Sequence, residues 1–523
     1  MNSTNSITIS SKQLTIKQIS KYLSSPGKVT LNKDTKIIIE DARKVIESIL
    51  KNEKVVYGVN TGFGKFSEKL IKPKDVTELQ KRLIMSHAAG VGRPVSREIA
   101  RLMMLLKVKS LANGHSGCRL EVVQLLVDML NRNVIPVIPR KGSVGASGDL
   151  APLAHMALVM MGEGSAYIIK STHKSGIHEW KRVDGKSALE SAGLKPLTFE
   201  AKEGLALING TQAICAFGIW SIIHTEKLLK NADIVAAMSL EALNGTLTAF
   251  DEKIQEVRNH SGQLKVAENI RNILEKSQIV ASHKKSSHRV QDAYSLRCIP
   301  QVHGAVRDAL DHISSVFVNE ANGVTDNPLV FPKTGEVLSG GNFHGAPVAY
   351  ASDYLSIVLT DLAGLSERRI EHMLDPSMSE LPAFLANDGG INSGFMIAHV
   401  TAASLVSENR VLSHPASVDS IPTSANKEDH VSMGTFAARK TAEIAKNFET
   451  ILAIELLCAC QALELRAPLK PSKVTAALLS MVRKHIPFWQ EDRLMYKDIN
   501  MSKEFVHSGR LLSECEKVAG NIL

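Results

Sequence analysis

Apolar side chains recur at three- and four-residue steps through most of the chain, and this spacing predicts amphipathic helices. The segment Ser96–Asn113 begins at a good helix-capping serine and stops before Gly114. Two further segments are unusually long: Val348–Leu374, interrupted only by Gly364, and Thr435–Arg466, which lacks Gly and Pro until Pro468. Helices of this length are typical of bundles. In the last segment one apolar stripe predicts a core or subunit interface, formed by Ile444, Phe448, Ile451, Leu452 and Leu456.

Signals for strands are few. The run Ala166–Lys170 alternates weakly, and Leu329–Leu338 reads as a hairpin with Thr334 and Gly335 at its turn. The predicted fold is therefore all-α: a long-helix bundle core, a smaller and mostly helical N-terminal lobe, and minor β hairpins. We expect the division near residue 220, with lobes 1–220 and 221–523 that form one interdependent unit.

Composition narrows the possible partners. The chain has 523 residues, 44% of them hydrophobic and 22% charged, which suits a globular protein with a large core. The formal charge of +9 is dispersed, aromatic residues make up only 5%, and the densest basic stretch, 283–289, is short, so we expect a solvated loop there and no nucleic-acid partner. No apolar run is long enough for a membrane span, and no signal-peptide core is present at the N-terminus. The six cysteines include no CxxC pair, so we expect a cytoplasmic, reduced protein and no metal site.

The most unusual segment is Arg140–His155, RKGSVGASGDLAPLAH, in which three glycines precede a helical run. Its spacing fits neither a phosphate-binding loop nor a dinucleotide-binding turn, and it lacks the nucleophile elbow of serine hydrolases. One interpretation is a plain helix start, with Asp149 accepting backbone hydrogen bonds and Pro152 in the first turn. The other is chemical: the amide nitrogen of Gly148 can attack the carbonyl carbon of Ala146, and loss of water from the ring and from Ser147 would leave an electrophilic methylidene.

These residues resemble the signature of the histidine and aromatic amino acid ammonia-lyases, whose prosthetic group is 4-methylideneimidazol-5-one (MIO) formed from Ala-Ser-Gly. The similarity extends over nearly the whole chain. Further matching blocks are Tyr57–Gly64 (YGVNTGFG), Ser86–Gly90 (SHAAG), Asn209–Gln212 (NGTQ), Gln291–Gln301 (QDAYSLRCIPQ), Gly340–His344 (GGNFH) and Ser417–Met433 (SVDSIPTSANKEDHVSM).

The resemblance implies non-oxidative elimination of ammonia from an L-amino acid, with MIO from Ala146, Ser147 and Gly148 and no external cofactor. It implies that Tyr57 is the general base and that Arg297 binds the substrate carboxylate. The remaining positions would surround the prosthetic group and substrate: Asn209 and Tyr294 through hydrogen bonds, Phe343 through aromatic packing, and Gln291 nearby.

Two positions bear on the substrate. Histidine-specific members of the family carry Ser-His where phenylalanine- and tyrosine-specific members carry Phe-Leu and His-Leu, and this chain has Ser86-His87. Glu428 matches a glutamate that contacts the imidazole, and a carboxylate is a poor neighbour for a phenyl ring. Both imply L-histidine as substrate and urocanate as product. Two neighbouring positions depart from the pattern: Ala293 replaces an expected Pro, and Lys427 a common Gln.

The resemblance also implies a homotetramer whose active sites are shared between chains. A tyrosine or phenylalanine ammonia-lyase and an MIO-dependent aminomutase remain alternatives within the family. A helical lyase of the fumarase and aspartase type would need a GSSxxPxKxN stretch, which this sequence lacks. A non-catalytic helical scaffold is the remaining alternative of a different class.

Overall fold

The computed structural model describes residues 5–523 except 53, 63, 67, 174–176 and 284–289. The basic stretch 283–289 therefore falls, apart from His283, outside the described residues. Contacts divide the chain into two units: the first comprises residues 1–220, 314–353 and 415–439, and the second comprises 221–313, 354–414 and 440–523. The predicted two-lobe division placed 314–353 and 415–439 in the second lobe. A single cut along the sequence cannot separate these units, because four long helices contribute residues to both.

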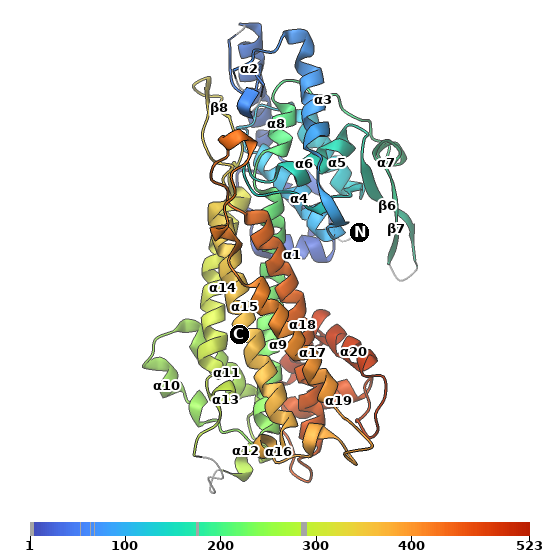
Figure 1. The fold of residues 1–523 in the computed structure, drawn as a ribbon, viewed down its shortest axis with the longest axis vertical. Coiled ribbons are helices and arrows are strands. Elements are labelled where there is room, and N and C mark those ends of the chain that lie inside the picture. The colour runs from blue at the N-terminus through green and yellow to red at the C-terminus, as the bar shows by residue number, and fades with distance from the viewer. Residues whose placement is uncertain (1–4, 53, 63, 67, 174–176, 284–289) are drawn as a thin grey trace. The chain divides into compact units, whose positions relative to one another are not determined.

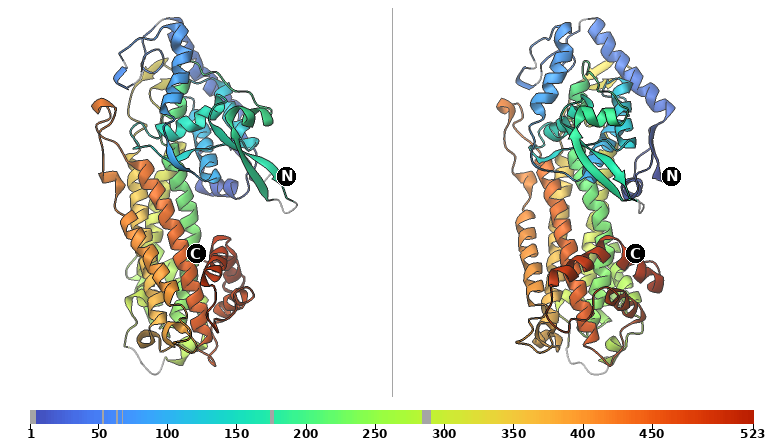
Figure 2. Two further views of the ribbon diagram at one scale, coloured as in Figure 1. Left: turned by 45° about the vertical axis from the view of Figure 1, so that its right-hand side comes forward. Right: turned by 90° about the vertical axis from the view of Figure 1, so that its right-hand side faces the viewer.

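Those four helices are α9 (Gln212–Ala242), α14 (Ile299–Asn322), α15 (Ala346–Leu374) and α18 (Gly434–Glu464). In the second unit they run side by side with α17 (Met396–Leu412), as both views show (Figures 1 and 2). The predicted long segments are thus confirmed, and Gly364 does not interrupt α15. All five residues of the predicted apolar stripe on α18 are fully buried, so the stripe is core.

Polar contacts also join the bundle helices. The buried Arg369 of α15 forms an ion pair of 2.5 Å with Glu455 of α18, and Ser239 of α9 donates a 2.7 Å hydrogen bond to the same carboxylate. His303 of α14 contacts Asp233 of α9 at 2.8 Å. These contacts fix the helices relative to one another, because breaking one would leave a buried charge without a partner.

Shorter helices complete the second unit: α10 (Glu252–Glu256), α11 (Ser261–Ile273), α12 (Gln278–Ser282), α13 (Tyr294–Arg297), α16 (Pro376–Ser379), α19 (Lys473–Arg483), α20 (Met495–His507) and α21 (Arg510–Ala519). Among them, α21 packs on α19 and α20. The six cysteines of the chain are free thiols. Among the described residues, no helix is long and apolar enough to span a bilayer.

The first unit is built around α4, which begins at the predicted capping residue Ser96 and is buried along nearly its whole length. Helix α4 packs on α5, while α3, α6 and α8 pack on one another. The helices that lie wholly in this unit are α1 (Ile16–Ser24), α2 (Lys33–Lys51), α3 (Val76–His87), α4 (Arg97–Leu111), α5 (Leu120–Asn131), α6 (Leu150–Met160), α7 (Gly185–Ser191) and α8 (Glu203–Ile208).

The described strands form sheets of only two or three strands. They are β1 (Ile7–Ile9) with β2 (Val29–Leu31), β3 (Val91–Pro94) with β5 (Pro139–Lys141), β4 (Ile135–Pro136) with the β6–β7 ribbon (Ser165–Thr172, His178–Asp184), and β8 (Leu329–Phe331) with β9 (Glu336–Leu338). The last pair is the predicted hairpin, with Val330 opposite Val337. The predicted all-α class with minor β hairpins is confirmed.

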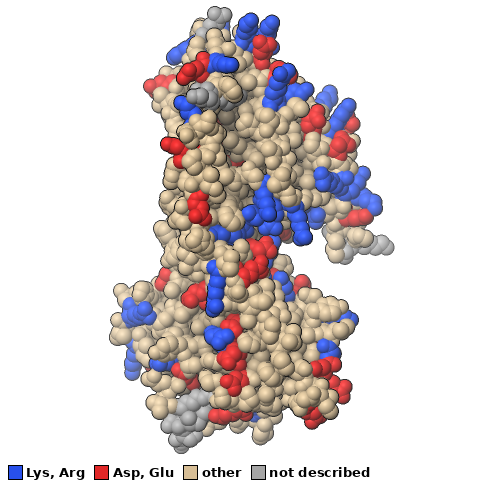
Figure 3. Space-filling model, in the orientation of Figure 1, with Lys and Arg blue, Asp and Glu red and all other residues tan. Residues whose placement is uncertain are grey.

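Figure 3 shows acidic and basic side chains intermixed over the face that it draws.

Candidate active site

The glycine-rich turn lies in the first unit between β5 and α6 and is fixed to the end of α8. Gly148 has φ +71°, and a Cβ placed there would lie 2.1 Å from the carbonyl oxygen of Gly210. The amide of Asp149 donates to that oxygen at 2.7 Å, and the amide of Gly210 donates to the carbonyl of Ser147 at 3.3 Å. Position 148 therefore accepts only glycine, for both its backbone angle and its contact.

A second segment holds the other side of the turn. The amide of Met433 donates to the carbonyl of Val144 at 2.9 Å, and the Ser432 hydroxyl donates to the carbonyl of Gly145 at 3.1 Å. Gly145 has φ +70°, and a Cβ there would lie 2.2 Å from the Ser432 hydroxyl oxygen. The residues just before α18 are thus packed along the turn, which places the NKEDH motif beside it.

Asp149 does not act as a plain helix start would predict. Its side chain makes no capping bond to α6, which follows it. Instead it is fully buried and accepts from the amides of Ala213 and Ile214, at 2.7 and 2.9 Å, in the first turn of α9. The hydroxyl of Thr435 donates to its other oxygen at 2.7 Å. Burial outweighs these bonds and raises the pKa of Asp149 to about 6.

Glu428 faces the reactive serine of the turn. The Ser147 hydroxyl donates to Oε1 of Glu428 at 3.2 Å, while the hydroxyls of Thr423 and Ser424 donate to Oε2 at 2.7 and 2.6 Å. The short helix 424–426 that carries this loop has positive φ at Ser424, Ala425 and Asn426. Such strain in residues with a Cβ costs free energy and is concentrated at functional sites. The loop therefore holds a strained backbone that directs the Glu428 carboxylate toward Ser147.

His87, the last residue of α3, has a defined tautomer. Its Nδ1 lies 2.8 Å from the carbonyl oxygen of Leu83, and because a carbonyl only accepts, Nδ1 must carry the proton. The Nε2 atom is then a hydrogen-bond acceptor. Burial lowers the pKa of His87, although the Leu83 bond and the charge of Glu428 oppose it, so the ring is neutral near pH 7. The effect of the Glu428 charge on this pKa means that His87 and Glu428 lie in the same site.

Tyr57 is half-buried in the YGVNTGFG loop, of which Phe63 lies outside the described residues. The short helix at Gly64–Phe66 contacts the strained helix before Glu428. Burial raises the pKa of Tyr57, a hydrogen bond with the backbone of Gly64 lowers it, and the charge of Glu428 raises it further. Within this environment the phenol is protonated at neutral pH.

Asn209 is one residue before the glycine that contacts the turn. Its amide nitrogen donates to Asp326 at 3.3 Å and to the carbonyl of Asn327 at 3.1 Å. Its buried Oδ1 has no hydrogen-bond partner, and a buried acceptor left in this state is costly unless a ligand satisfies it. Asp326 is itself held by the fully buried Lys202 at 2.7 Å. Phe343 is half-buried in the loop before α15 in the same unit.

The other three predicted residues belong to the second unit. Tyr294 and Arg297 are the two ends of α13, and the guanidinium of Arg297 lies 4.5 Å from the centre of the Tyr294 ring. Tyr294 is 69% exposed, Gln291 is exposed, and the buried Nε of Arg297 has no hydrogen-bond partner. The first unit therefore brings Tyr57, His87, the turn and Glu428 into one environment, and the second unit pairs Tyr294 with Arg297.

The turn fits the formation of an MIO group on three observations. Gly148 has the left-handed backbone that a side chain would not tolerate, the neighbouring Asn209 offers an unsatisfied acceptor, and a carboxylate lies in contact with the Ser147 hydroxyl. Sequence analysis missed the roles of Asp149, Thr423, Ser432 and Asp326. Asp149, Ser432 and Asp326 act through partners far away in the chain, so no local spacing reveals them, whereas Thr423 lies five positions before its partner Glu428 in the same loop.

Comparisons with known proteins identify the family of the chain. A histidine ammonia-lyase from Natranaerobius thermophilus is 51% identical over 517 residues, which cover 99% of this chain and all of that protein. The crystal structure of histidine ammonia-lyase from Trypanosoma cruzi matches with a TM-score of 0.88 at 43% identity, covering 98% of this chain and 95% of that one. A tyrosine aminomutase from Streptomyces globisporus matches with a TM-score of 0.89 at 33% identity, covering 98% of each chain. The aromatic amino acid lyase family matches over residues 14–484, and the chain belongs to this family.

Proposed function

We propose that the chain eliminates ammonia from L-histidine to give trans-urocanate, the first step of histidine degradation. The observation that carries the proposal is the 3.2 Å hydrogen bond from Ser147, in a turn that demands glycine at 148, to the carboxylate of Glu428. Relatives named histidine ammonia-lyase that match nearly the whole chain support the same reaction.

Ala146, Ser147 and Gly148 would form the MIO group. A bond forms between the Gly148 nitrogen and the Ala146 carbonyl carbon, and two water molecules leave, one from that carbonyl and one from the Ser147 hydroxyl. The left-handed backbone at Gly148 and its close contact with Gly210 bias the turn toward this compact shape. When present, the group supplies an electrophile that makes the amino group of the substrate a better leaving group.

His87 and Glu428 would select the imidazole. The acceptor Nε2 of His87 suits a substrate N–H, and the Glu428 carboxylate suits a second N–H or an imidazolium. A phenyl ring offers neither donor, so it would leave Oε1 of Glu428 desolvated and without a donor once the Ser147 hydroxyl is lost. This pair therefore favours L-histidine over L-phenylalanine.

Tyr57 would remove the β-proton. Burial raises the pKa of Tyr57, so its phenolate would form only with stabilisation from groups that gather around it. Arg297 would bind the substrate carboxylate, together with Gln291 and Tyr294, while Asn209 and Phe343 contact the substrate and prosthetic group. We propose a homotetramer in which these second-unit residues reach the turn of another chain, which would be consistent with the exposure of Tyr294 and Gln291. The free cysteines suit a reducing cytoplasm.

A tyrosine or phenylalanine aminomutase is the second candidate, because the aminomutase structure matches this fold at 33% identity. Such an enzyme would return ammonia to the β-carbon and release a β-amino acid. The His87 acceptor has no partner on a phenyl ring, which weakens the phenylalanine form of this candidate, whereas the phenol of tyrosine could donate to that acceptor. The released product distinguishes the two.

Peptide mass tests the proposed prosthetic group directly. The peptide that contains residues 146–148 should be lighter by two water molecules in the native protein than its sequence requires. The Ser147→Ala variant serves as the control, because it cannot lose the hydroxyl water. A native peptide of full mass in an active preparation would contradict the proposal.

A further inference from the structure

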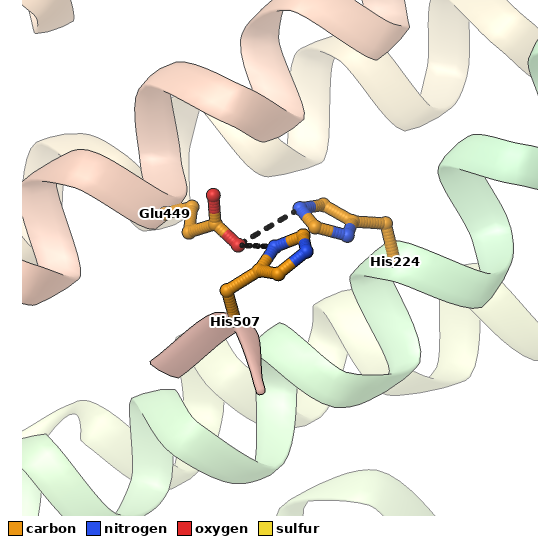
Figure 4. Close-up of side chains that lie close together, drawn as sticks. All are labelled: His224, Glu449 and His507. Carbon is orange, nitrogen blue, oxygen red and sulfur yellow. Dashed lines mark hydrogen bonds and ion pairs between the residues drawn. The ribbon is translucent and has the colours of Figure 1, made fainter. Parts of the chain in front are cut away.

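Outside the candidate active site, the second unit contains a His-Glu-His cluster, which we define as His224, Glu449 and His507. The three residues come from three helices, α9, α18 and α20, and their side chains point toward one another (Figure 4). Nδ1 of His507 lies 2.8 Å from Oε1 of Glu449, and Nε2 of His224 lies 3.3 Å from the same oxygen. One ligand atom from each residue lies within 4.8 Å of the other two.

The spacing suits a small divalent cation. Bonds of roughly 2.0–2.2 Å in tetrahedral geometry place neighbouring ligand atoms about 3.3 Å apart, close to the 2.8 and 3.3 Å from the two imidazoles to the Glu449 oxygen. Two imidazoles and one carboxylate are also a ligand set that Zn²⁺ takes in proteins, with a water in the fourth position. Small side-chain rotations would therefore let the three atoms share one ion.

The cluster is buried on the side of Glu449 and His224 and exposed on the side of His507. The side chains of Glu449 and His224 are only 4% and 11% exposed, whereas His507 is 58% exposed. Burial disfavours ionisation of Glu449, but its hydrogen bonds and charge interactions with His224 and His507 prevail and lower its pKa to about 2. The cluster thus offers an anion between two imidazoles, open to solvent on the His507 side.

Lys503 supports the carboxylate from its other oxygen. Its ammonium lies 3.5 Å from Oε2 of Glu449 and donates to the Thr450 hydroxyl at 3.0 Å. Lys503 and His507 are one turn apart on α20, so both reach the same carboxylate from one face. A partner on the second oxygen orients a ligating carboxylate, and Oε1 remains directed at the two imidazoles.

We propose that His224, Glu449 and His507 bind one Zn²⁺ ion that ties α20 to α9 and α18. The sequence analysis predicted no metal site. The three ligands of the proposed site lie in separate helices far apart in the chain, so they form no recognisable spacing. The site would join the last part of the chain to two helices of the bundle, with the fourth position of the ion taken by water. Binding to the folded chain alone would raise its stability in proportion to the logarithm of the ion concentration.

Cobalt titration of the full-length protein tests the site. After treatment with a chelator and its removal, Co²⁺ should bind at one ion per chain, give the visible bands of tetrahedral coordination, and be displaced by Zn²⁺. Glu449→Gln keeps the size and an acceptor oxygen, and His507→Ala alters an exposed side chain, so both should fold. Each should weaken binding at least about 100-fold, because even outer-shell changes cost 10–100-fold.

His178→Ala is the matched control, because His178 is an exposed histidine on β7 and should leave the titration unchanged. Thermal unfolding with and without Zn²⁺ gives a second reading, in which only the native protein and the control gain stability. Native protein that shows no tetrahedral bands, or a Glu449→Gln variant that binds as tightly as native protein, would overturn the proposal. Both readings are independent of the proposed lyase reaction.

Discussion

Two fully buried aspartates, one in each unit, show how differently the turn and the bundle treat a negative charge. Asp233 in the bundle has a guanidinium beside it: burial raises its pKa, but the charge of Arg307 at 2.6 Å and a hydrogen bond with His303 at 2.8 Å more than offset this and lower it. Asp149 beside the turn has only neutral donors in direct contact, and its pKa rises to about 6.

The difference separates a region built for stability from one built for chemistry. In the bundle, Glu455 is bound by Arg369, Ser239 and Ser366, so the buried charge is fully compensated. Around the turn, three consecutive residues with a Cβ have positive φ before Glu428, Oδ1 of Asn209 has no hydrogen-bond partner, and Asp149 has no cation in contact; the second unit also contains positive φ angles, as at Phe384, and unsatisfied buried atoms, as at Arg307 Nε. Those around the turn are costs that a ligand or a reaction would offset.

Matched serine variants should separate the two regions most strongly. Ser147→Ala should lower kcat by about a thousandfold or more, the scale of losing a covalent catalytic group, with little change in stability. Ser239→Ala should leave kcat nearly unchanged and lower the free energy of unfolding by about 1–3 kcal/mol, because it removes a donor from a buried carboxylate. Ammonia release and denaturant unfolding measure both. Equal effects of the two variants on stability and activity would remove the distinction.

A broken ion pair in the bundle should have the next largest effect. Arg369→Met leaves Glu455 charged and buried, so unfolding should become easier by about 3–5 kcal/mol. Adding Glu455→Leu should recover much of that loss. As a control, Lys170→Ala breaks the exposed Lys170–Glu179 pair on the β6–β7 ribbon and should cost less than about 1 kcal/mol. A small effect of Arg369→Met would show that the bundle does not depend on compensated charge.

The pH dependence of stability should differ in sign between the two aspartates. The raised pKa of Asp149 stabilises the folded protein in acid, and this contribution is lost as the pH rises through about 6. The lowered pKa of Asp233 contributes stability above its ordinary pKa, and this is lost as the pH falls through its folded value. The free energy of unfolding of Asp149→Asn and of Asp233→Asn, measured across a pH series relative to native protein, should change with pH in opposite directions. Each change should be on the order of 1–3 kcal/mol over the series. Slopes of the same sign would contradict the comparison.

Local signals predicted the helices and the hairpin well. Ser96 capping α4 and the long run of α18 needed only spacing and capping residues, because both depend on neighbours in sequence. The Ala146-Ser147-Gly148 turn was also visible, since its three residues are adjacent in the chain.

Contacts between residues far apart in the sequence could not be predicted from local spacing. The bond from Ser147 to Glu428 spans 281 positions, and Asp149 reaches the start of α9 some 64 positions later. The alternative interpretation of Asp149 as a plain capping residue of its own helix was wrong for this reason. The two contact units are not separated by one cut along the sequence because four helices contribute to both, and the His-Glu-His cluster appears only when three helices meet.

The most direct test of the central claim is product formation from separate incubations with L-histidine, L-tyrosine and L-phenylalanine. Released ammonia and the ultraviolet absorbance of the conjugated acid identify each product, and amino acid analysis detects any β-amino acid. We predict ammonia and urocanate from L-histidine alone. Product from L-tyrosine or L-phenylalanine but not from L-histidine would contradict the assignment of His87 and Glu428, and no product from any substrate would contradict the lyase itself.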